Sequence, residues 1–512
     1  MKNSNLLRIL LLLLAFSTVL ACFVGCNDTA KKPDDTTESR EETTDPEGKS
    51  DDTTEGQEET TDPEGESVYP NAPSLQIPES LDYNNAPISV LAWNSDYTDF
   101  SHQVKEKSGV AIDEAVFVRD ANLSERVGVI LNYSPIAAGA NQVQTLSFKN
   151  FVQQAHKGGT PYDIVAGHTR CNAVCASAGY FLDLNSIADS YIETANPWWN
   201  DDMVEKISIG DSVFMITGDA SASFVQMIYC VYFNADMFAD DGLESPYDLV
   251  ESNQWTYVKM LEMGQNFYQD LNKNKKKDLA DMLPITGQYN DWPALFHGCE
   301  INYATKDGEG HIIVDPILIG DKAIDLYAEV YDAVWSKGAY VGKDENLLES
   351  FLAEKTLFWI TYSGRANESF SGVTFEYGCV PMPKYNSKQA DYHCAVRQPI
   401  SLFSVMKGVD GARHQMISAV LEAWAYEAYT NTTPVIFKQI MQYQKSASPE
   451  MAAMLGLIRD SAYFDFVRIY SADYGVGGCD FIGNYLYAGT DWKEVTKPGG
   501  VYDTWCGVDV FD

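Results

Sequence analysis

The sequence predicts an α/β fold in which parallel strands are covered by helices on both faces. Two observations predict it. Short apolar strands alternate with helical segments, a rhythm typical of β-α-β units. The chain has 512 residues, and about 430 of them read as folded, which is more than one hydrophobic core usually contains, so at least two domains are expected.

The first 26 residues have the pattern of a secretory signal. Lys2 and Arg8 give a positive start, and residues 9–21 form an apolar run that is shorter than the roughly 20 residues that span a bilayer. Cys26 ends this segment and resembles the lipobox cysteine of bacteria, which is acylated after cleavage. Cys22 is a competing match. We favour Cys26 because cleavage at Cys22 would leave Phe23 and Val24 in a polar tail, although Phe23 departs from the usual leucine. An ordinary signal peptide with a coincidental cysteine is the alternative.

The segment that follows predicts a tether. Residues 27–67 contain 16 acidic and 4 basic residues and no aromatic residue, and residues 41–48 recur unchanged at 58–65. Such a composition does not bury enough apolar surface to offset chain entropy. We therefore expect an acidic, disordered tether over residues 27–84, with a reach of roughly 35 to 40 Å or more. An acidic tail with its own partner is the alternative.

The charge and the cysteines restrict the function further. A net charge of −37 argues against nucleic acid and against a polyanionic ligand, because phosphate recognition depends on Lys and Arg. No apolar run after the signal is long enough to span a bilayer. The eight cysteines after Cys26 fit either disulfides or small buried hydrophobic residues. Cys171 and Cys175 lack the second ligand pair that a zinc site needs.

The elements that begin the folded body can be placed from the pattern of apolar residues. The sequence predicts strands over residues 88–93, 129–133 and 162–167. It predicts helices over residues 115–127, after the acidic pair Asp113 and Glu114, and over 146–156. Each strand is short and apolar, as expected for a parallel sheet that is buried on both faces.

Five short motifs then follow one another, and their order is more specific than any of them alone. They are Tyr162-Asp163-Ile164-Val165, Gly210 to Asp219, Tyr229 to Phe238, Gly242 to Val250, and Gln254-Trp255-Thr256-Tyr257. In this order they resemble the extracellular solute-binding proteins of ABC importers, in which the second motif is a strand that enters the hinge. The third motif is similar to the family's segment φ-x-Y/F-F-N-x-x-φ-F, where φ is an apolar residue. The fourth reads as a Gly-Leu turn followed by a Pro-Tyr-Asp-Leu-Val helix.

The resemblance implies a two-domain, periplasmic-binding-protein-like fold of type II, with parallel-rich sheets, a hinge and an inter-domain cleft that holds the ligand. We expect one lobe to take residues 85–222 and 393–449, and the other to take 223–392 and 450–512. Within the motifs, Thr256 is suited to cap a helix over residues 257–268, and Trp255 is expected to be buried beside it.

Ligands of open α/β sheets lie beyond the carboxyl ends of the strands. The loops that follow the predicted strands, together with two aromatic segments, carry side chains suited to a sugar, whose C–H face packs on a ring while its hydroxyls need planar hydrogen-bonding groups. Trp198 and Trp199 could equally form the buried lid of a loop. The predicted ligand-binding residues are Trp93, Asn94, Asp96, His168, Arg170, Trp198, Trp199, Asp219, Trp292, Tyr362, Arg365 and Arg397.

One loop has the oxygen spacing of a calcium site. Its candidate ligands are Asp270, Asn272, Asn274, Asp278 and Asp281. Lys275 replaces the glycine of the sharp turn, and Asp281 replaces the longer bidentate Glu. The loop therefore looks like a decayed Ca²⁺ site, with a solvated turn as the alternative, and no other cofactor is predicted.

No catalytic motif of the G-x-S-x-G, H-E-x-x-H or Walker A type is present, so no enzymatic activity is predicted. The resemblance and the aromatic loops predict a protein anchored by lipid, palmitate included, on the extracellular face of the cell membrane. It would capture a carbohydrate, best an oligosaccharide, by hinge closure and deliver it to ABC permease subunits. The alternatives are a binder of a peptide or other polar solute, a surface glycan adhesin, and a glycoside hydrolase.

Overall fold

The computed structural model describes the folded body of the chain. The described residues are 73–94, 109–139, 141–343, 346–366, 370, 372–441, 448–470 and 480–498. Residues 65–512 group into one compact unit. Cys22, Cys26, the repeats of the tether and Asp96 lie outside the described residues. Among the described residues, no helix is both long enough and apolar enough to cross a membrane.

The first sheet has four strands in the order β12-β3-β1-β2. Strand β1 pairs in parallel with both β2 and β3, while β12 is antiparallel to β3. The three strands predicted here are confirmed, and β2 extends four residues beyond its predicted end. The strands are β1 (Ala86–Asn94), β2 (Val129–Ala137), β3 (Ile164–His168) and β12 (Ser401–Ser404).

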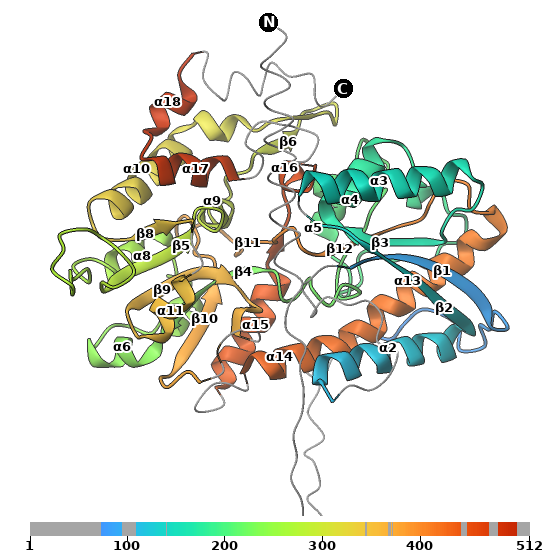
Figure 1. Cartoon of the computed structure of the whole chain (residues 1–512), viewed down its shortest axis with the longest axis horizontal. Coiled ribbons are helices and arrows are strands. Elements are labelled where there is room, and N and C mark those ends of the chain that lie inside the picture. Colours follow the sequence, from blue (N-terminus) through green and yellow to red (C-terminus); the bar gives the residue numbers. More distant parts are fainter. Residues whose placement is uncertain are drawn as a thin grey trace, which may run out of the picture. The chain divides into compact units, whose positions relative to one another are not determined.

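Four helices accompany this sheet, and they can be followed in Figure 1. Both predicted helices are confirmed, and each begins four residues earlier than predicted. Asp113 and Glu114 lie within the first turn of the first helix rather than before it, and the Asn141 side chain caps the second by accepting from Gln144 N at 2.9 Å. The helices are α2 (Ala111–Val127), α3 (Gln142–Lys157), α4 (Thr169–Ser177) and α13 (His414–Glu427).

The second sheet has five strands in the order β10-β4-β9-β5-β8. Strand β5 pairs in parallel with β9 and β8, and β4 is antiparallel to β9 and β10. Its strands are β4 (Tyr229–Asn234), β5 (Leu283–Gln288), β8 (Tyr340–Gly342), β9 (Thr356–Tyr362) and β10 (Tyr377–Pro381). Its helices are α6 (Ala235–Asp240), α7 (Pro246–Glu251), α8 (Tyr257–Met263), α9 (Pro293–Gly298), α10 (Asp321–Trp335) and α11 (Leu347–Leu352).

The start of α8 agrees with the prediction, but its end does not. The Thr256 hydroxyl caps the helix by accepting from Lys259 N at 3.2 Å. Trp255 is fully buried and donates its indole N–H to Pro381 O at 2.8 Å. The helix ends at Gly264 rather than at residue 268. A side chain at Gly264 would meet Pro284 at 2.8 Å, so the chain passes close to strand β5 and turns there.

Two segments run between the sheets as neighbours, residues 209–228 and residues 394–403. Isolated β-bridges join the two segments, one between Ile216 and Phe403 and one between Ile228 and Val396. The continuous strand predicted over residues 210–219 is therefore wrong. The segment changes partner instead, because Gly218 bridges to Trp199, so closely that a side chain there would lie 2.1 Å from Trp198 O.

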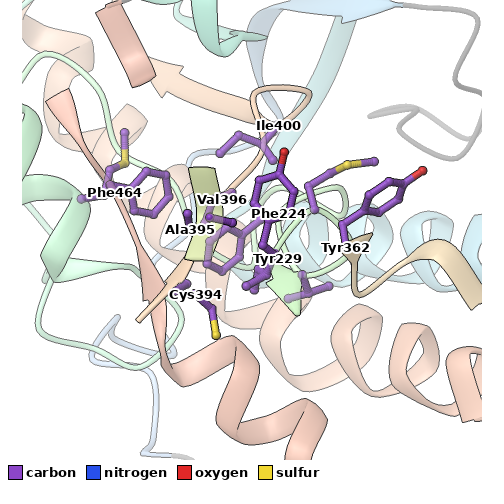
Figure 2. Packing of buried hydrophobic residues seen from close by; sticks show 14 of the residues in the cluster. Phe224, Tyr229, Tyr362, Cys394, Ala395, Val396, Ile400 and Phe464 are labelled. Carbon is purple, nitrogen blue, oxygen red and sulfur yellow. The ribbon is translucent and has the colours of Figure 1, made fainter. Parts of the chain in front are cut away.

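The second of these segments also contacts the C-terminal part of the chain. Strand β11 (Cys394–Ala395) pairs in parallel with β13 (Ala462–Tyr463). Figure 2 shows Cys394, Ala395, Val396 and Ile400 among the aromatic residues of this region. Phe224 and Phe464 stack there with ring centroids 6.3 Å apart. The hydrophobic core thus continues from one sheet to the other through the crossing.

The remaining elements are short, apart from two helices near the C-terminus. The described cysteines are all buried, and none of them forms a disulfide with another described cysteine; they are Cys171, Cys175, Cys230, Cys299, Cys379 and Cys394. The remaining elements are η3 (Leu184–Ser186), α5 (Asp201–Ile207), β6 (Ala304–Lys306), β7 (Ile312–Val314), η4 (Pro316–Ile319), η5 (Gly411–Arg413), the π-helix η6 (Ala428–Thr432), α14 (Thr433–Met441), α15 (Pro449–Asp460), α16 (Phe466–Tyr470), α17 (Phe481–Ala488) and α18 (Trp492–Thr496).

Candidate functional site

The carboxyl ends of strands β1 and β3 meet the crossing segment. Trp93 is buried and donates its indole N–H to Ser401 Oγ at 2.7 Å. The His168 ring packs edge to face on Trp93, with centroids 5.1 Å apart. Burial, with a smaller effect of the Arg170 charge, lowers the pKa of His168 to about 3. His168 is therefore a neutral imidazole, and because its Nδ1 accepts from Arg170 N, its Nε2 carries the N–H donor.

The crossing segment itself is held by backbone hydrogen bonds. Arg397 N donates to Met227 O at 2.8 Å. Ser401 N donates to Ser221 Oγ at 3.0 Å, and Thr217 Oγ1 donates to Ser401 O at 2.7 Å. These bonds fix where the side chains of residues 397–401 emerge between the two sheets.

At the end of strand β9, two arginines lie against one tyrosine ring. The guanidinium carbon of Arg397 is 4.1 Å from the Tyr362 ring centroid, and that of Arg365 is 4.6 Å away. Tyr362 is buried, and both arginines are half-buried. Contact of a guanidinium with an aromatic face is favourable and orients the planar group.

A carboxylate and a second tyrosine adjoin this pair. Asp291 follows strand β5, is buried, and accepts from Gln288 N at 3.1 Å. Burial raises the pKa of Asp291, while the charges of Arg397 and Arg365 oppose that rise. Tyr229, the first residue of β4, donates its hydroxyl to Asn290 O at 2.9 Å. Burial raises the pKa of Tyr229 as well.

Helix α16 adds a residue that the sequence reasoning missed. Arg468 is buried, and its guanidinium carbon lies 5.6 Å from the Tyr229 ring centroid. Gln398 Nε2 donates to Arg468 O at 2.8 Å, and α16 packs against α4. The only signal in the sequence is an arginine among the mostly apolar residues 464–470, which a core segment without a function would show equally well.

We call this cluster the crossing site. Of the predicted ligand residues, the structure brings Trp93, His168, Tyr362, Arg365 and Arg397 to it. Arg170 lies beside it on α4, half-buried, with its backbone N donating to His168 Nδ1 at 3.2 Å. Asn94 is exposed at the end of β1. The crossing site is made up of Trp93, His168, Tyr229, Asp291, Tyr362, Arg365, Arg397 and Arg468.

Trp198 and Trp199 lie in a different cluster. Both are buried, and their indole N–H groups donate to the two carboxylate oxygens of Glu422 on α13, at 2.8 and 2.6 Å. Asn196 Nδ2 donates to the same carboxylate at 2.7 Å. The indole donors of both tryptophans are thus used within the protein, as in the alternative of a buried lid, and ligand contact by these residues stays a prediction.

Asp219 and Trp292 also have partners within the protein. Asp219 is buried and forms an ion pair with Arg459, and it accepts from the Thr433 hydroxyl. Trp292 is buried and donates to Tyr340 O at 3.3 Å. Trp292 follows Asp291 in sequence, and its contact with a ligand remains a prediction.

The calcium-like loop is closed by its own hydrogen bonds. Asn272 and Asn274 donate their amide N–H groups to Asp278, and Asp281 accepts from Leu271 N, Tyr268 Oη and Asp278 N. Lys275 has a positive φ of 60° where a calcium loop has glycine. In the described part of the chain, no group of three or more His, Cys, Asp or Glu side chains is arranged to hold a metal. Binding of Ca²⁺ therefore stays untested.

Comparison with known proteins identifies the family. The model of the bacterial extracellular solute-binding protein family matches residues 123–404, which is more than half of the chain. No curated protein matches the sequence.

Solved structures share the fold. The cyclic alpha-maltosyl-1,6-maltose binding protein of Arthrobacter globiformis is 12% identical, with a TM-score of 0.51 over 80% of this chain and 95% of its own. A cyclo/maltodextrin-binding protein complexed with maltotetraose is 12% identical, with a TM-score of 0.50 over 80% and 94%. The uncharacterized protein lmo0859 of Listeria monocytogenes EGD-e is 11% identical, with a TM-score of 0.51 over 80% and 96%. At such identities the similarity establishes the fold alone. Together with the family match, it shows that this chain belongs to the bacterial extracellular solute-binding proteins and has their two-domain α/β architecture.

Proposed function

We propose that this protein captures a carbohydrate, best an oligosaccharide, at the crossing site and delivers it to an ABC importer. The proposal is supported by two groups on the same crossing segment: Trp93, which packs on His168, donates to Ser401, and four residues earlier Arg397 lies against the Tyr362 ring. Ring faces and planar hydrogen-bonding groups are the combination that a sugar requires. The two sugar-binding structures named above have the same fold, which supports this choice of ligand class.

The binding step would be a hinge closure. The two sheets with their helices would move as bodies about the crossing segments, residues 209–228 and 394–403. A ligand that contacts residues of both sheets favours the closed state by its differential affinity. A group of the first sheet, such as His168, and one of the second, such as Arg397, would then bind the same molecule.

The proposal includes a lipid anchor at Cys26 and a spacer role for the acidic segment after it. The support is the lipobox-like sequence and the low-complexity composition. Incorporation of labelled palmitate into the wild-type protein and into the variants C26S and C22S tests it. Label that is lost in C26S alone supports the assignment, whereas label that is lost in C22S alone moves the anchor, and label absent from the wild type removes it.

Isothermal titration against a panel of neutral and acidic oligosaccharides tests the ligand class. We expect saturable binding with one site per chain and an unchanged sugar after incubation. Binding of peptides alone would replace the carbohydrate by another polar solute. Release of shorter sugars, followed by chromatography, would show catalysis and end the receptor proposal.

A further inference from the structure

A cavity that the proposed function does not use lies beside helix α5. It has a volume of about 200 Å³, and its described walls are the end of α5, the hairpin of strands β6 and β7, and residues 463–466. We call it the α5 pocket. None of the crossing-site residues belongs to its walls. In Figure 2, the crossing segment at residues 394–396 lies between Phe464, which lines the pocket, and Tyr362 of the crossing site.

Two polar side chains of the α5 pocket keep hydrogen-bond donors that no described residue uses. Lys306 on β6 donates from Nζ to Glu205 O at 2.8 Å and to Ser208 Oγ at 2.7 Å. An ammonium group has three N–H donors, so one remains. Asn302 accepts from the Tyr463 hydroxyl through Oδ1, and its amide Nδ2 has no acceptor among the described residues. A ligand in the pocket would therefore have to supply oxygen acceptors.

The charges around the α5 pocket argue against a charged ligand. Its walls contain two ammonium groups, on Lys206 and Lys306, and two carboxylates, on Glu205 and Asp465. Outside the walls, three carboxylates and one guanidinium act on residues of the pocket; they are Asp202, Asp211, Asp315 and Arg468. An anion would find no excess of positive charge here, and a cation would face two ammonium groups. The pocket is therefore suited to a neutral ligand.

The size and the apolar part of the walls narrow the class further. Ile312 of β7 and the rings of Phe464 and Phe466 are buried and line the pocket. Pockets for drug-sized ligands measure about 300 to 1,000 Å³, so a cavity of about 200 Å³ suits a smaller molecule. A single sugar ring combines that size with an apolar C–H face and with hydroxyl oxygens that accept hydrogen bonds.

We propose that the α5 pocket is a second ligand site, which binds one neutral monosaccharide through Lys306 and Asn302. The proposal does not depend on the ligand of the crossing site. A sugar in the pocket would join α5 to the hairpin of β6 and β7, as the hydrogen bonds of Lys306 already do.

Titration calorimetry with single sugars tests the proposal. The probes are glucose, galactose, mannose, xylose and arabinose, with glucuronate and glucosamine as charged counterparts. We expect at least one neutral sugar to bind with a dissociation constant of about 1 mM or lower, because a ligand of this size makes few contacts. Glucuronate and glucosamine should bind about tenfold more weakly than their neutral counterparts, because their charges would lose water without gaining a partner.

Variants place the sugar in the α5 pocket. K306M removes the ammonium group, and A304L fills part of the cavity while leaving Lys306 in place. Each should weaken the binding of the neutral sugar by about tenfold or more. The matched controls are K259M and A353L, because Lys259 pairs with Glu244, Ala353 is exposed, and neither lines the pocket. Both controls, and Y362L at the crossing site, should keep the affinity within about twofold. Thermal unfolding confirms that each variant is folded.

Three results would overturn the second site. If K306M and A304L leave the affinity unchanged, the sugar binds elsewhere, and a loss in Y362L would assign it to the crossing site. If glucuronate or glucosamine binds more tightly than the neutral sugars, the ligand class is wrong. If no neutral sugar binds at up to about 10 mM, the α5 pocket is not a sugar site. None of these results bears on the capture of an oligosaccharide at the crossing site, which its own titration tests.

Discussion

Two clusters of this protein combine aromatic rings with polar side chains and differ in how the polar groups are held. In the Glu422 cluster, Trp198, Trp199 and Asn196 all donate to one buried carboxylate. In the crossing site, the polar ends of Arg365 and Arg397 lie half-buried around a tyrosine ring. The first cluster satisfies its donors within the fold and so contributes stability. The second holds two guanidinium groups against a tyrosine ring at the crossing, and its part in ligand binding is the proposal made above.

The largest expected effect concerns the buried ion pair of Asp219 and Arg459. Arg459 also donates to the carbonyl oxygen of Pro197, the residue before Trp198 of the Glu422 cluster. The variant R459M keeps the length and the apolar part of the side chain but leaves the Asp219 carboxylate buried without its cation. We expect a loss of about 3 to 5 kcal/mol in the free energy of unfolding. Urea unfolding followed by fluorescence measures it.

The control for R459M is K337Q, which removes the cation of the Lys337–Asp332 pair, in which both side chains are exposed. This change should cost less than about 1 kcal/mol. Equal losses in the two variants would show that the Asp219 pair is not the buried anchor described above.

The Glu422 cluster is tested by E422Q. A glutamine has a single carbonyl oxygen, so one of the two indole N–H groups would face an amide N–H instead of an acceptor. We expect the free energy of unfolding to fall by about 2 to 3 kcal/mol, the usual cost of leaving a buried donor unsatisfied. The affinity for the sugar should not change in the folded fraction. The control is E251Q, at an exposed position of α7. If E422Q lost affinity for the sugar but kept its stability, the two tryptophans would belong to the binding site.

The crossing site should show the opposite behaviour. The variant Y362L keeps apolar volume and removes the ring on which two guanidinium groups lie. We expect the affinity for the sugar to fall about tenfold, equal to about 1.4 kcal/mol, with a smaller change in stability. Y426L removes a ring that also faces an arginine, Arg126 at 5.3 Å, but packs on Trp198. Y426L should therefore lower the free energy of unfolding and leave the affinity for the sugar unchanged. If Y362L and Y426L both lowered the affinity, the two clusters would not differ in function.

More of the fold than of the candidate site could be predicted from the sequence. The strands and helices around β1, β2 and β3 follow from local pattern, because apolar runs and caps such as Asn141 act over a few residues. The use of a side chain depends on contacts between distant segments. Trp198 and Trp93 are both buried tryptophans, yet one donates to Glu422 and the other to Ser401 at the crossing. The sequence around either tryptophan does not indicate which residue is its hydrogen-bond partner, because that partner is more than 200 residues away in the chain.

Arg468 is a residue of the crossing site that could not be predicted from the local sequence. Its neighbours in sequence are apolar, and only the packing of α16 against α4 brings it over Tyr229. The strand wrongly expected over residues 210–219 from the family resemblance contains an apolar run at 213–216, but its backbone partners change from Trp199 at Gly218 to Phe403 at Ile216. A hinge requires such a change of partner, and local periodicity does not report it.

The smallest expected effect concerns the carboxylates that join the first sheet's helices to the C-terminal segment. Asp202 on α5 accepts from Phe464 N at 2.9 Å, and Asp465 accepts from Tyr303 N at 2.8 Å. Burial raises the pKa of each carboxyl to about 6. Between about pH 4 and 6 the folded state therefore binds more protons than the unfolded state, and stability falls as the pH rises through this window. Lowering the pH from 7 to 5 should raise the free energy of unfolding by about 1 kcal/mol for each group.

The variant D202N separates this effect from other titrations. An asparagine carbonyl still accepts from Phe464 N, but the group no longer titrates beside Glu205, Lys206 and Asp465, whose charges act on it. We expect D202N to gain about 1 kcal/mol less than the wild type between pH 7 and 5, as measured by urea unfolding at both values. D211N, at an exposed position, should keep the wild-type difference. If D202N shows the wild-type difference in the free energy of unfolding as well, the Asp202 carboxyl titrates as an exposed one does. The hydrogen bond from Phe464 N to Asp202 would then be open to water in solution. Sugar affinity should be the same in D202N and the wild type at pH 7, because this link holds the two segments together and lies outside the crossing site.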